Sequence, residues 1–344
     1  PVEGLKNMII WTITAGKAGM KAQARGLARE LLSLAGGGEF AEKVCDGQLA
    51  RLLPASLYAR GWARPATLRA APGAPEPQAA PQMVIACGSR AARAGLWARH
   101  AFRAFAVYVQ RPPFAARHFD AVVCPEHDTP CGGNVIRTLG ALGEVSARSL
   151  AGRRPGAVRR FAGIPAPRIA LLAGGGNRAF SLDETQARRL ARELAAAVGE
   201  AGGGILATPS RRTGRDARRA LQEELTQAKG AAFFWDGTGE NPYLDILAAA
   251  DAFVVTGDSV NMLSEACTAA KPVYIWRLAP RPGPWHRRRA AKFFRFHEAL
   301  AARGLARGWE GDLNFWQAPG LAETERAAAE LWRRFRAAAG ARTR

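Results

Sequence analysis

The chain has 344 residues, of which 48% are hydrophobic, and its formal net charge is +20. This length is typical of about two domains, and the lack of any apolar run near the roughly 18 residues of a membrane-spanning helix favours a cytoplasmic protein. The five cysteines form no CxxC pair, which argues against a disulfide framework. Abundant arginine and alanine fit a GC-rich genome, but the charge also favours an anionic partner, such as a nucleotide or a membrane face. The usual nucleic-acid-binding motifs are missing.

The N-terminal half begins in the manner of an α/β domain. Residues 8–14, MIIWTIT, predict a first strand, and a glycine-bearing turn leads into an amphipathic helix over residues 20–34. The turn lacks the GK[ST] ending of a Walker A loop. Residues 63–82 are rich in proline and alanine and predict an insertion. Short apolar runs predict four further strands, at residues 83–86, 105–110, 119–124 and 134–138.

Three adjacent titratable residues, Glu126, His127 and Asp128, follow the third of these further strands. A loop at a strand end is where a general base can reach a substrate, so this cluster supplies our candidate catalytic residues. A simple polar turn is the alternative. Cys124 and Cys131 flank His127 at a spacing that could ligate zinc. Because no second cluster supplies a fourth ligand, we expect no metal.

Glycine-rich and cationic loops mark the second half of the chain. A basic, proline-broken segment at residues 151–167 predicts an interdomain linker before it. Four strands are expected beyond the linker, at residues 168–173, 204–208, 231–235 and 252–256. Because the ends of parallel strands share one edge, their loops predict a nucleotide or nucleotide-sugar site, with backbone amides and arginines facing a diphosphate. The candidate binding residues of the first three loops are Gly174, Gly175, Asn177, Ser210, Arg211, Arg212, Gly239 and Asn241.

The fourth loop lies in a strand–loop–helix–strand pattern that spans residues 251–276. Asp258 or Ser259 can cap the helix, whose N-terminus is an anion site because its free N–H groups and positive dipole end point at the crevice. Glu265, further along the helix, can accept hydrogen bonds from ribose hydroxyls. The alternative is that Asp258 is only an N-cap and Glu265 only a solvated helix residue.

A proline-rich, basic segment follows at residues 279–292 and contains Trp285 and residues 287–289, which are all arginine. It could face a membrane or a phosphate, and a solvated loop is the alternative. Two more helices are expected, at residues 293–302 and 321–339.

Six segments of the chain carry a family resemblance that spans nearly its whole length. They are WTITAGKAGMKAQARGLA, VVCPEHD, TLGAL, TPSRRT, WDGTGENPY and ADAFVVTGDSVNMLSEACTAAKPVYI. Together they resemble the bacterial relatives of the plant mitochondrial-fission "elongated mitochondria" proteins, a family also grouped with outer-core glycosyltransferases of bacterial lipopolysaccharide. The resemblance implies an α/β fold of the GT-B type, in which two Rossmann-like domains with parallel sheets face a central cleft. It implies an acceptor-side domain (1–160), a nucleotide-sugar domain (161–320) and a helix that crosses back to the first domain (321–344).

The resemblance implies metal-independent transfer of a sugar from a nucleotide-sugar donor, UDP-linked or similar, with no other cofactor. The acceptor would be a lipid-linked, lipopolysaccharide or other envelope glycan at the inner membrane, with the protein in peripheral contact with that anionic membrane. The family pattern places Ser259 and Asn261 at the donor diphosphate and Glu265 at the ribose. Many GT-B enzymes have two glycines in this loop, whereas in this chain Asp258 adds a negative charge next to the expected phosphates. That carboxylate is therefore expected either to turn away as a cap or to contact sugar hydroxyls.

In the implied mechanism, His127 or Asp128 deprotonates the acceptor hydroxyl, while Arg211 and Arg212 stabilise the leaving diphosphate. Two alternatives stay open. A nucleotide-sugar epimerase of the same fold would need acidic residues at both faces of the sugar, and the candidates are Asp258, Glu240 and Glu126. A non-catalytic membrane-surface adaptor, by analogy with the plant fission factors, would tolerate decay of the glycine loops, which are intact in this sequence.

Overall fold

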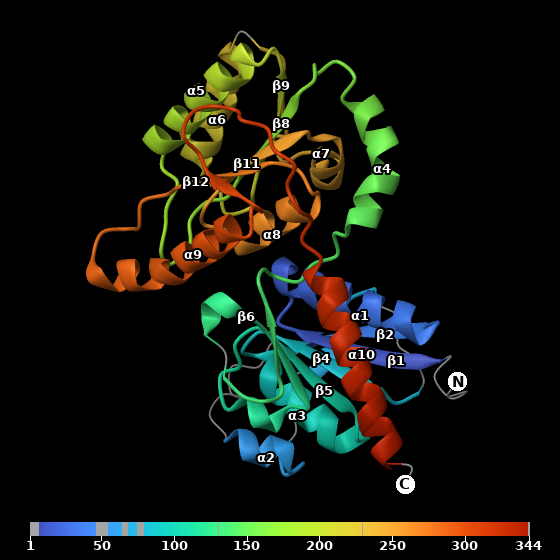
Figure 1. The fold of residues 1–344 in the computed structure, drawn as a ribbon. Helices are drawn as coiled ribbons and strands as arrows, with labels where there is room; N and C mark the ends of the chain where they lie inside the picture. The colour runs from blue at the N-terminus through green and yellow to red at the C-terminus, as the bar shows by residue number, and fades with distance from the viewer. Residues whose placement is uncertain are drawn as a thin grey trace. The chain divides into compact units, whose positions relative to one another are not determined.

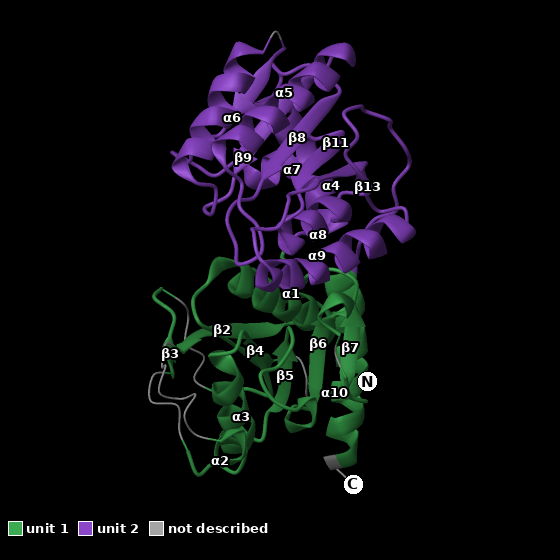
Figure 2. Ribbon diagram, turned by 90° about the vertical axis from the view of Figure 1, so that its left-hand side faces the viewer, with its two compact units in different colours: residues 1–144, 323–344 green, residues 145–322 purple. Residues whose placement is uncertain are grey.

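Two compact units make up the chain (Figures 1 and 2). Residues 1–144 and 323–344 form unit 1, and residues 145–322 form unit 2. The structure is a computed structural model, and it describes residues 7–45, 54–63, 68–73, 79–129, 131–228 and 230–342.

Unit 1 is built on a sheet with the strand order β3-β2-β1-β4-β5-β6-β7. All neighbouring strands run parallel except β2 and β3. The strands are β1 (Met8–Thr14), β2 (Gly38–Cys45), β3 (Leu68–Ala70), β4 (Met83–Cys87), β5 (Phe105–Val109), β6 (Ala121–Pro125) and β7 (Val135–Thr138). The five strands predicted in this half are confirmed. The predictions lack β2, whose sequence GEFAEKVC mixes charged with apolar residues, and β3, which lies in the predicted insertion. Residues 64–67 and 74–78 of that insertion lie outside the described part of the chain.

Helices cover both faces of this sheet. On one face, alternate strand residues such as Ile85 and Val107 pack with α1 (Ala18–Ala35) and α10 (Glu323–Arg342). On the other face, the strands pack with α2 (Ala55–Ala59) and α3 (Ala91–Phe102) through side chains that include Tyr108. This two-sided burial explains why the strands are continuous apolar runs, since neither face meets water.

The last helix, α10, belongs to unit 1 although it ends the chain (Figure 1). Hydrogen bonds hold its first turn: the Glu323 carboxylate accepts from the Leu139 N–H at 2.6 Å, and the Thr324 hydroxyl accepts from the Gly143 N–H at 3.0 Å and donates to the Gly143 carbonyl at 3.2 Å. Leu331 then packs into the same core as α1.

Unit 2 contains a fully parallel sheet with the order β10-β9-β8-β11-β12-β13. Its strands are β8 (Arg168–Ala173), β9 (Gly204–Pro209), β10 (Ala232–Phe234), β11 (Ala252–Thr256), β12 (Val273–Trp276) and β13 (Arg307–Gly308). The chain runs outward from β8 in one direction and from β11 in the other. The crevice at the carboxyl ends of β8 and β11 is therefore the topological switch point, where open α/β sheets bind their ligands.

The helices of unit 2 include one that the sequence analysis expects to be a linker. They are α4 (Ala147–Arg160), α5 (Glu184–Glu200), α6 (Arg215–Gln227), α7 (Tyr243–Ala249), α8 (Val260–Thr268) and α9 (Pro284–Ala302). The prediction of a linker from residue 151 is wrong, because α4 is helical through Pro155. Tertiary contacts outweigh the proline: Arg154 donates to the Ala248 carbonyl at 2.9 Å and to the Asp251 carboxylate at 2.8 Å.

Candidate functional site

The loops after β8, β9 and β11 meet around one buried carboxylate, that of Asp258. Only 1% of Asp258 is exposed. Its Oδ1 accepts from the Thr256 hydroxyl at 2.8 Å and its Oδ2 from the Gly175 N–H at 3.0 Å, while Arg212 Nη2 lies 3.5 Å from Oδ2. The Asn177 side-chain amide donates to the Asp258 carbonyl at 3.0 Å. The structure thus brings together three of the four loops that the sequence places at one sheet edge.

The glycines of the β8 loop allow the other loops to pack closely against it. A Cβ at Gly174 would lie 2.1 Å from Asp258 Oδ1, and a Cβ at Gly175 would lie 2.1 Å from the Arg212 carbonyl oxygen. The amides of Gly174, Gly175 and Gly176 donate to the Thr256 hydroxyl, the Asp258 carboxylate and the Arg212 carbonyl, respectively. The expectation that this loop offers its amides to a diphosphate is therefore corrected, because the protein itself supplies their acceptors.

Asp258 turns inward, so it links two loops and is not the helix cap. Burial raises the pKa of this carboxyl, and the hydrogen bonds from Gly175 and Thr256 and the charge of Arg212 oppose the rise. The N-cap of α8 is Ser259, whose hydroxyl accepts from the Met262 N–H at 3.4 Å. Of the two roles that the sequence left open for Asp258, the cap is wrong, and contact with sugar hydroxyls stays a prediction.

The loop before α8 is also fixed from α9. His297 is 5% exposed, and its Nε2 donates to the Gly257 carbonyl at 2.9 Å. A Cβ at Gly257 would lie 2.8 Å from the His297 ring, which explains the glycine. The sequence analysis missed this histidine, because no spacing along the chain connects it with a loop 40 residues earlier. The N-terminus of α8, with Ser259 and Asn261, is thereby held in place at the switch point.

Cationic side chains surround this edge. Arg211 is exposed, and the Arg212 side chain is 47% exposed although its backbone is part of the buried assembly. Thr213, absent from our candidates, anchors the same loop: its hydroxyl accepts from the Ser210 N–H at 2.9 Å and donates to the Ala173 carbonyl at 3.1 Å. From the β12 side, Arg281 donates to the Phe180 carbonyl at 3.0 Å. These arginines favour an anion at the edge.

Glu265 projects from α8 at its second turn and accepts a hydrogen bond from the Tyr243 hydroxyl of α7. Burial raises the pKa of Tyr243 well above its usual value, and the Glu265 charge adds to the rise, so the phenol stays a donor at neutral pH. Tyr243 lies in the WDGTGENPY segment, yet the sequence did not indicate this pairing. The contact fixes the orientation of the carboxylate that the family pattern assigns to the ribose.

The loop after β10 carries the remaining candidates, Gly239 and Asn241, and both are exposed. Arg218 of α6 donates to the Asp236 carbonyl at 2.9 Å, and other contacts of the loop are local. The Asn241 side-chain oxygen accepts from the Tyr243 N–H at 3.0 Å, and Asp236 accepts from the Thr238 N–H and hydroxyl, which lowers the pKa of Asp236. The loop thus leads into the helix that carries the partner of Glu265.

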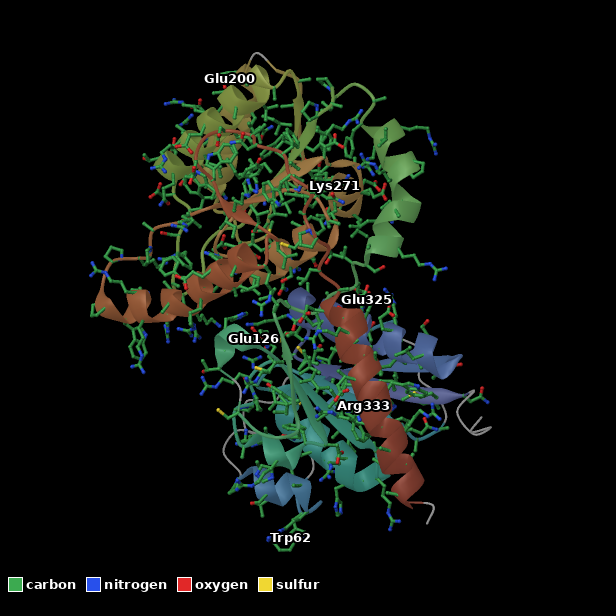
Figure 3. The ribbon with its side chains drawn as sticks, viewed as in Figure 1. Trp62, Glu126, Glu200, Lys271, Glu325 and Arg333 are labelled. Atoms are coloured by element: carbon green, nitrogen blue, oxygen red, sulfur yellow. The ribbon has the colours of Figure 1, made fainter. Side chains whose placement is uncertain are left out.

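In unit 1, Glu126, His127 and Asp128 form a short 3₁₀ helix, η3 (Glu126–Asp128), directly after β6. His127 is buried, Asp128 is half-buried, and Glu126, which is labelled in Figure 3, is exposed. Near them, Cys124 is buried and Cys131 is exposed. Among the described residues, no group of three or more His, Cys, Asp or Glu side chains is arranged to hold a metal ion.

Two solved structures are similar to this chain. The UDP-GlcNAc 2-epimerase of Methanocaldococcus jannaschii, in complex with UDP-GlcNAc and UDP, matches with a TM-score of 0.50 at 11% identity, over 94% of this chain and 99% of that one. MurG of Acinetobacter baumannii matches with a TM-score of 0.49 at 14% identity, over 95% of this chain and 91% of that one. The predicted fold class is confirmed: the protein is an α/β protein of the GT-B type, with two largely parallel sheets.

Residues 18–335 match the family described as mitochondrial fission ELM1, and the chain belongs to that family. The Arabidopsis thaliana mitochondrial fission protein ELM1 is 30% identical over 281 residues, or 74% of this chain. The uncharacterized protein RP120 of Rickettsia prowazekii is 23% identical over 231 residues, or 57% of this chain. Each alignment spans 64% of the relative's own length. In the described part of the chain, no helix has the length and apolar character needed to cross a membrane.

Proposed function

We propose that the chain is a metal-independent glycosyltransferase that uses a nucleotide-sugar donor. One observation carries the proposal: at the β8/β11 switch point, a buried carboxylate, Asp258, fixes the loop that begins α8, and Arg211 and Arg212 lie at the same edge. A rigid helix N-terminus beside two arginines suits a diphosphate. The shared fold of a nucleotide-sugar enzyme supports this choice of ligand class.

The donor would bind along α8. Ser259 and Asn261 lie in the first turn of α8, where the helix dipole favours the negative charge of a diphosphate. Arg211 and Arg212 would stabilise the charge that develops on the leaving diphosphate, which is usually the largest contribution to such catalysis. Glu265, oriented by Tyr243, would accept from the ribose hydroxyls. Asp258 would position these groups through the loops it joins.

The acceptor side is proposed to be unit 1, residues 1–144 and 323–344, which includes the returning helix α10, with unit 2, residues 145–322, as the donor domain. His127 or Asp128 would take the proton of the acceptor hydroxyl, with Glu126 beside them at the end of β6. A lipid-linked, lipopolysaccharide or other envelope glycan at the inner membrane is the proposed acceptor, because the protein is strongly basic and such acceptors lie at an anionic surface.

Thermal unfolding with UDP, GDP, ADP and CMP tests the donor site. A nucleotide at about 100 times its dissociation constant should stabilise the protein by about 2.7 kcal/mol. We expect one nucleotide to raise the melting temperature of the wild type, and Glu265→Ala to lose most of that rise. Glu200→Ala is the matched control, since Glu200 is exposed at the end of α5, far from α8 within unit 2 (Figure 3). An unchanged melting temperature with every nucleotide at millimolar concentration would contradict the proposal and leave the adaptor as the better hypothesis.

An epimerase is the second candidate, since the matched Methanocaldococcus structure has that activity in its name. Two contacts weigh against it. Both Asp258 oxygens already accept hydrogen bonds within the protein, and the Glu240 side chain is 80% exposed and lies 3.5 Å from Arg160. Turnover of a nucleotide sugar in the absence of any acceptor would favour the epimerase over the transferase.

A further inference from the structure

The chain between Glu265 and Glu298 contains no acidic residue. Its lysines and arginines are Lys271, Arg277, Arg281, Arg287, Arg288, Arg289, Lys292 and Arg295. Most of them lie on α9, near the exposed Trp285, which is 59% accessible. A positive field of this kind, unbroken by acidic neighbours in the sequence, suits an extended anionic surface.

The helix keeps these cations on its outer side. Trp285, Arg288, Lys292 and Arg295 follow one another at spacings of three or four residues, so they share one face of α9. On the inner side, Ala290 and the residues around Phe296 and Leu300 are buried in unit 2. The apolar face is therefore already packed, and the basic face is what α9 presents at the surface of unit 2.

Trp285 is exposed and has cationic side chains around it. The Arg289 guanidinium lies 4.8 Å from the centre of the Trp285 ring, within the range of a cation–π contact. Next to it, Arg287 and Arg288 are exposed, and the His286 ring is anchored by a contact of 2.7 Å to the Arg178 carbonyl. An exposed tryptophan among cations is typical of the interface between water and lipid headgroups.

We propose that this basic face, defined as Trp285, Arg288, Lys292 and Arg295, binds the anionic headgroups of a membrane surface together with the neighbouring Arg287 and Arg289. A single-stranded nucleic acid fits less well, because its bases stack on open aromatic faces and Arg289 already covers one face of the Trp285 ring. The purpose of this membrane binding rests on the proposed function, because a lipid-linked acceptor requires the enzyme at a bilayer. The binding itself requires no nucleotide and is testable apart from the donor site.

Flotation of the full chain with vesicles tests the basic face. Vesicles of phosphatidylcholine alone are compared with vesicles that also contain phosphatidylglycerol, without nucleotide, at low and at high salt. We expect binding to the anionic vesicles only, and weaker binding at high salt. Each basic residue near such a surface strengthens partitioning about fivefold, so Arg288→Glu with Lys292→Glu should weaken it at least about 25-fold. Trp285→Ala should weaken it by a smaller factor.

Matched controls separate the basic face from net charge. Arg148 and Arg159 are exposed on α4, so Arg148→Glu with Arg159→Glu makes the same charge change elsewhere. Trp62 is 72% exposed in unit 1 and controls for loss of an exposed indole. Equal effects of the two charge reversals, absence of binding to anionic vesicles at low salt, or a preference for single-stranded RNA over these vesicles would overturn the proposal. Both proposals are supported if the α9 variant loses vesicle binding but keeps the nucleotide-induced rise in melting temperature. If the variant loses vesicle binding but no nucleotide raises the melting temperature even of the wild type, only the proposed function is contradicted.

Discussion

The two units contain the same kind of switch point but fill it with different chemistry. In unit 2, the crevice between β8 and β11 holds a buried carboxylate, Asp258, that joins the loops and is bordered by arginine. In unit 1, no buried carboxylate is described at the crevice between β1 and β4, although Lys17 and Arg90 are the N-cap residues of the helices that follow these strands. Neutral groups pack beneath them: Gln23 Oε1 accepts from the Gln110 side chain at 3.3 Å and lies 3.9 Å from Cys87 Sγ. Burial strongly raises the pKa of the Cys87 thiol, so it too stays neutral.

This difference teaches that topology alone does not make an anion site. Both sheets place helix N-termini at the carboxyl ends of their central strands. Both switch points have cationic side chains nearby, but among the described residues it is in unit 2 that a buried carboxylate, Asp258, fixes the loops beside them. We therefore assign the donor to unit 2, and the following changes test how far the two switch points differ.

The largest effect is expected from Gly175→Ala. The new Cβ would lie 2.1 Å from the Arg212 carbonyl oxygen, and backbone on both sides would have to move. We expect a loss of about 3 kcal/mol in the free energy of unfolding, measured by urea denaturation. The corresponding loop of unit 1 should be more tolerant: Gly16→Ala meets no atom within 4 Å, and its φ of +78° costs only about 1 kcal/mol. Gly199→Ala in α5 is the control, and equal losses at residues 175 and 16 would contradict the comparison.

Asp258→Asn should produce a pH-dependent effect. Burial raises the pKa of Asp258 in the folded protein above its usual value of 3.8. The protonated form therefore adds stability that is fully present below pH 3.8 and is lost as the pH rises through the pKa of the folded state. The wild type should therefore gain stability relative to the variant as pH falls from neutral toward 3.8. Urea unfolding of both proteins across this range measures the difference. Asp216→Asn, on the exposed side of α6, controls for loss of a carboxylate, and a wild-type advantage that grows with rising pH would refute the expected sign.

A smaller effect is expected from Tyr243→Phe. The change removes the hydrogen bond to Glu265 and leaves the ring in place, which should cost about 1 kcal/mol of stability. If Glu265 contacts the ribose, the variant should also lose part of the nucleotide-induced rise in melting temperature. A stability loss with an undiminished nucleotide effect would mean that Tyr243 supports the fold alone.

Much of the fold could be predicted from the sequence because buried parallel strands are continuous apolar runs between glycine loops. Residues 8–14 and 252–256 are clear examples, and both are strands. The strand β2 escaped prediction because charged residues interrupt its apolar pattern. The helix α4 was mistaken for a linker because local propensity disfavours Pro155, whereas the contacts of Arg154 with residues about 95 positions away decide its structure.

The candidate site could be predicted only in part for the same reason. The loops after β8, β9 and β11 share an edge because parallel topology requires it. The acceptor of each loop amide depends on contacts between loops that are far apart in the sequence. The Gly175 N–H, for example, donates to the Asp258 carboxylate. The roles of Thr213, Tyr243 and His297 likewise follow from contacts across the sheet edge, and no motif at their own positions indicates them.

Isothermal titration of the stabilising nucleoside diphosphate, compared with its nucleoside, tests the central claim most directly. The account predicts that the diphosphate binds much more tightly than the nucleoside. It also predicts that Arg211→Ala with Arg212→Ala weakens the diphosphate at least about tenfold, because charge-assisted hydrogen bonds to a phosphate are lost. The Arg212 side chain is 47% exposed, so the fold should survive the change. Equal affinities for nucleoside and diphosphate, or a diphosphate affinity unaffected by the loss of both arginines, would contradict an anion site at the β8/β11 switch point.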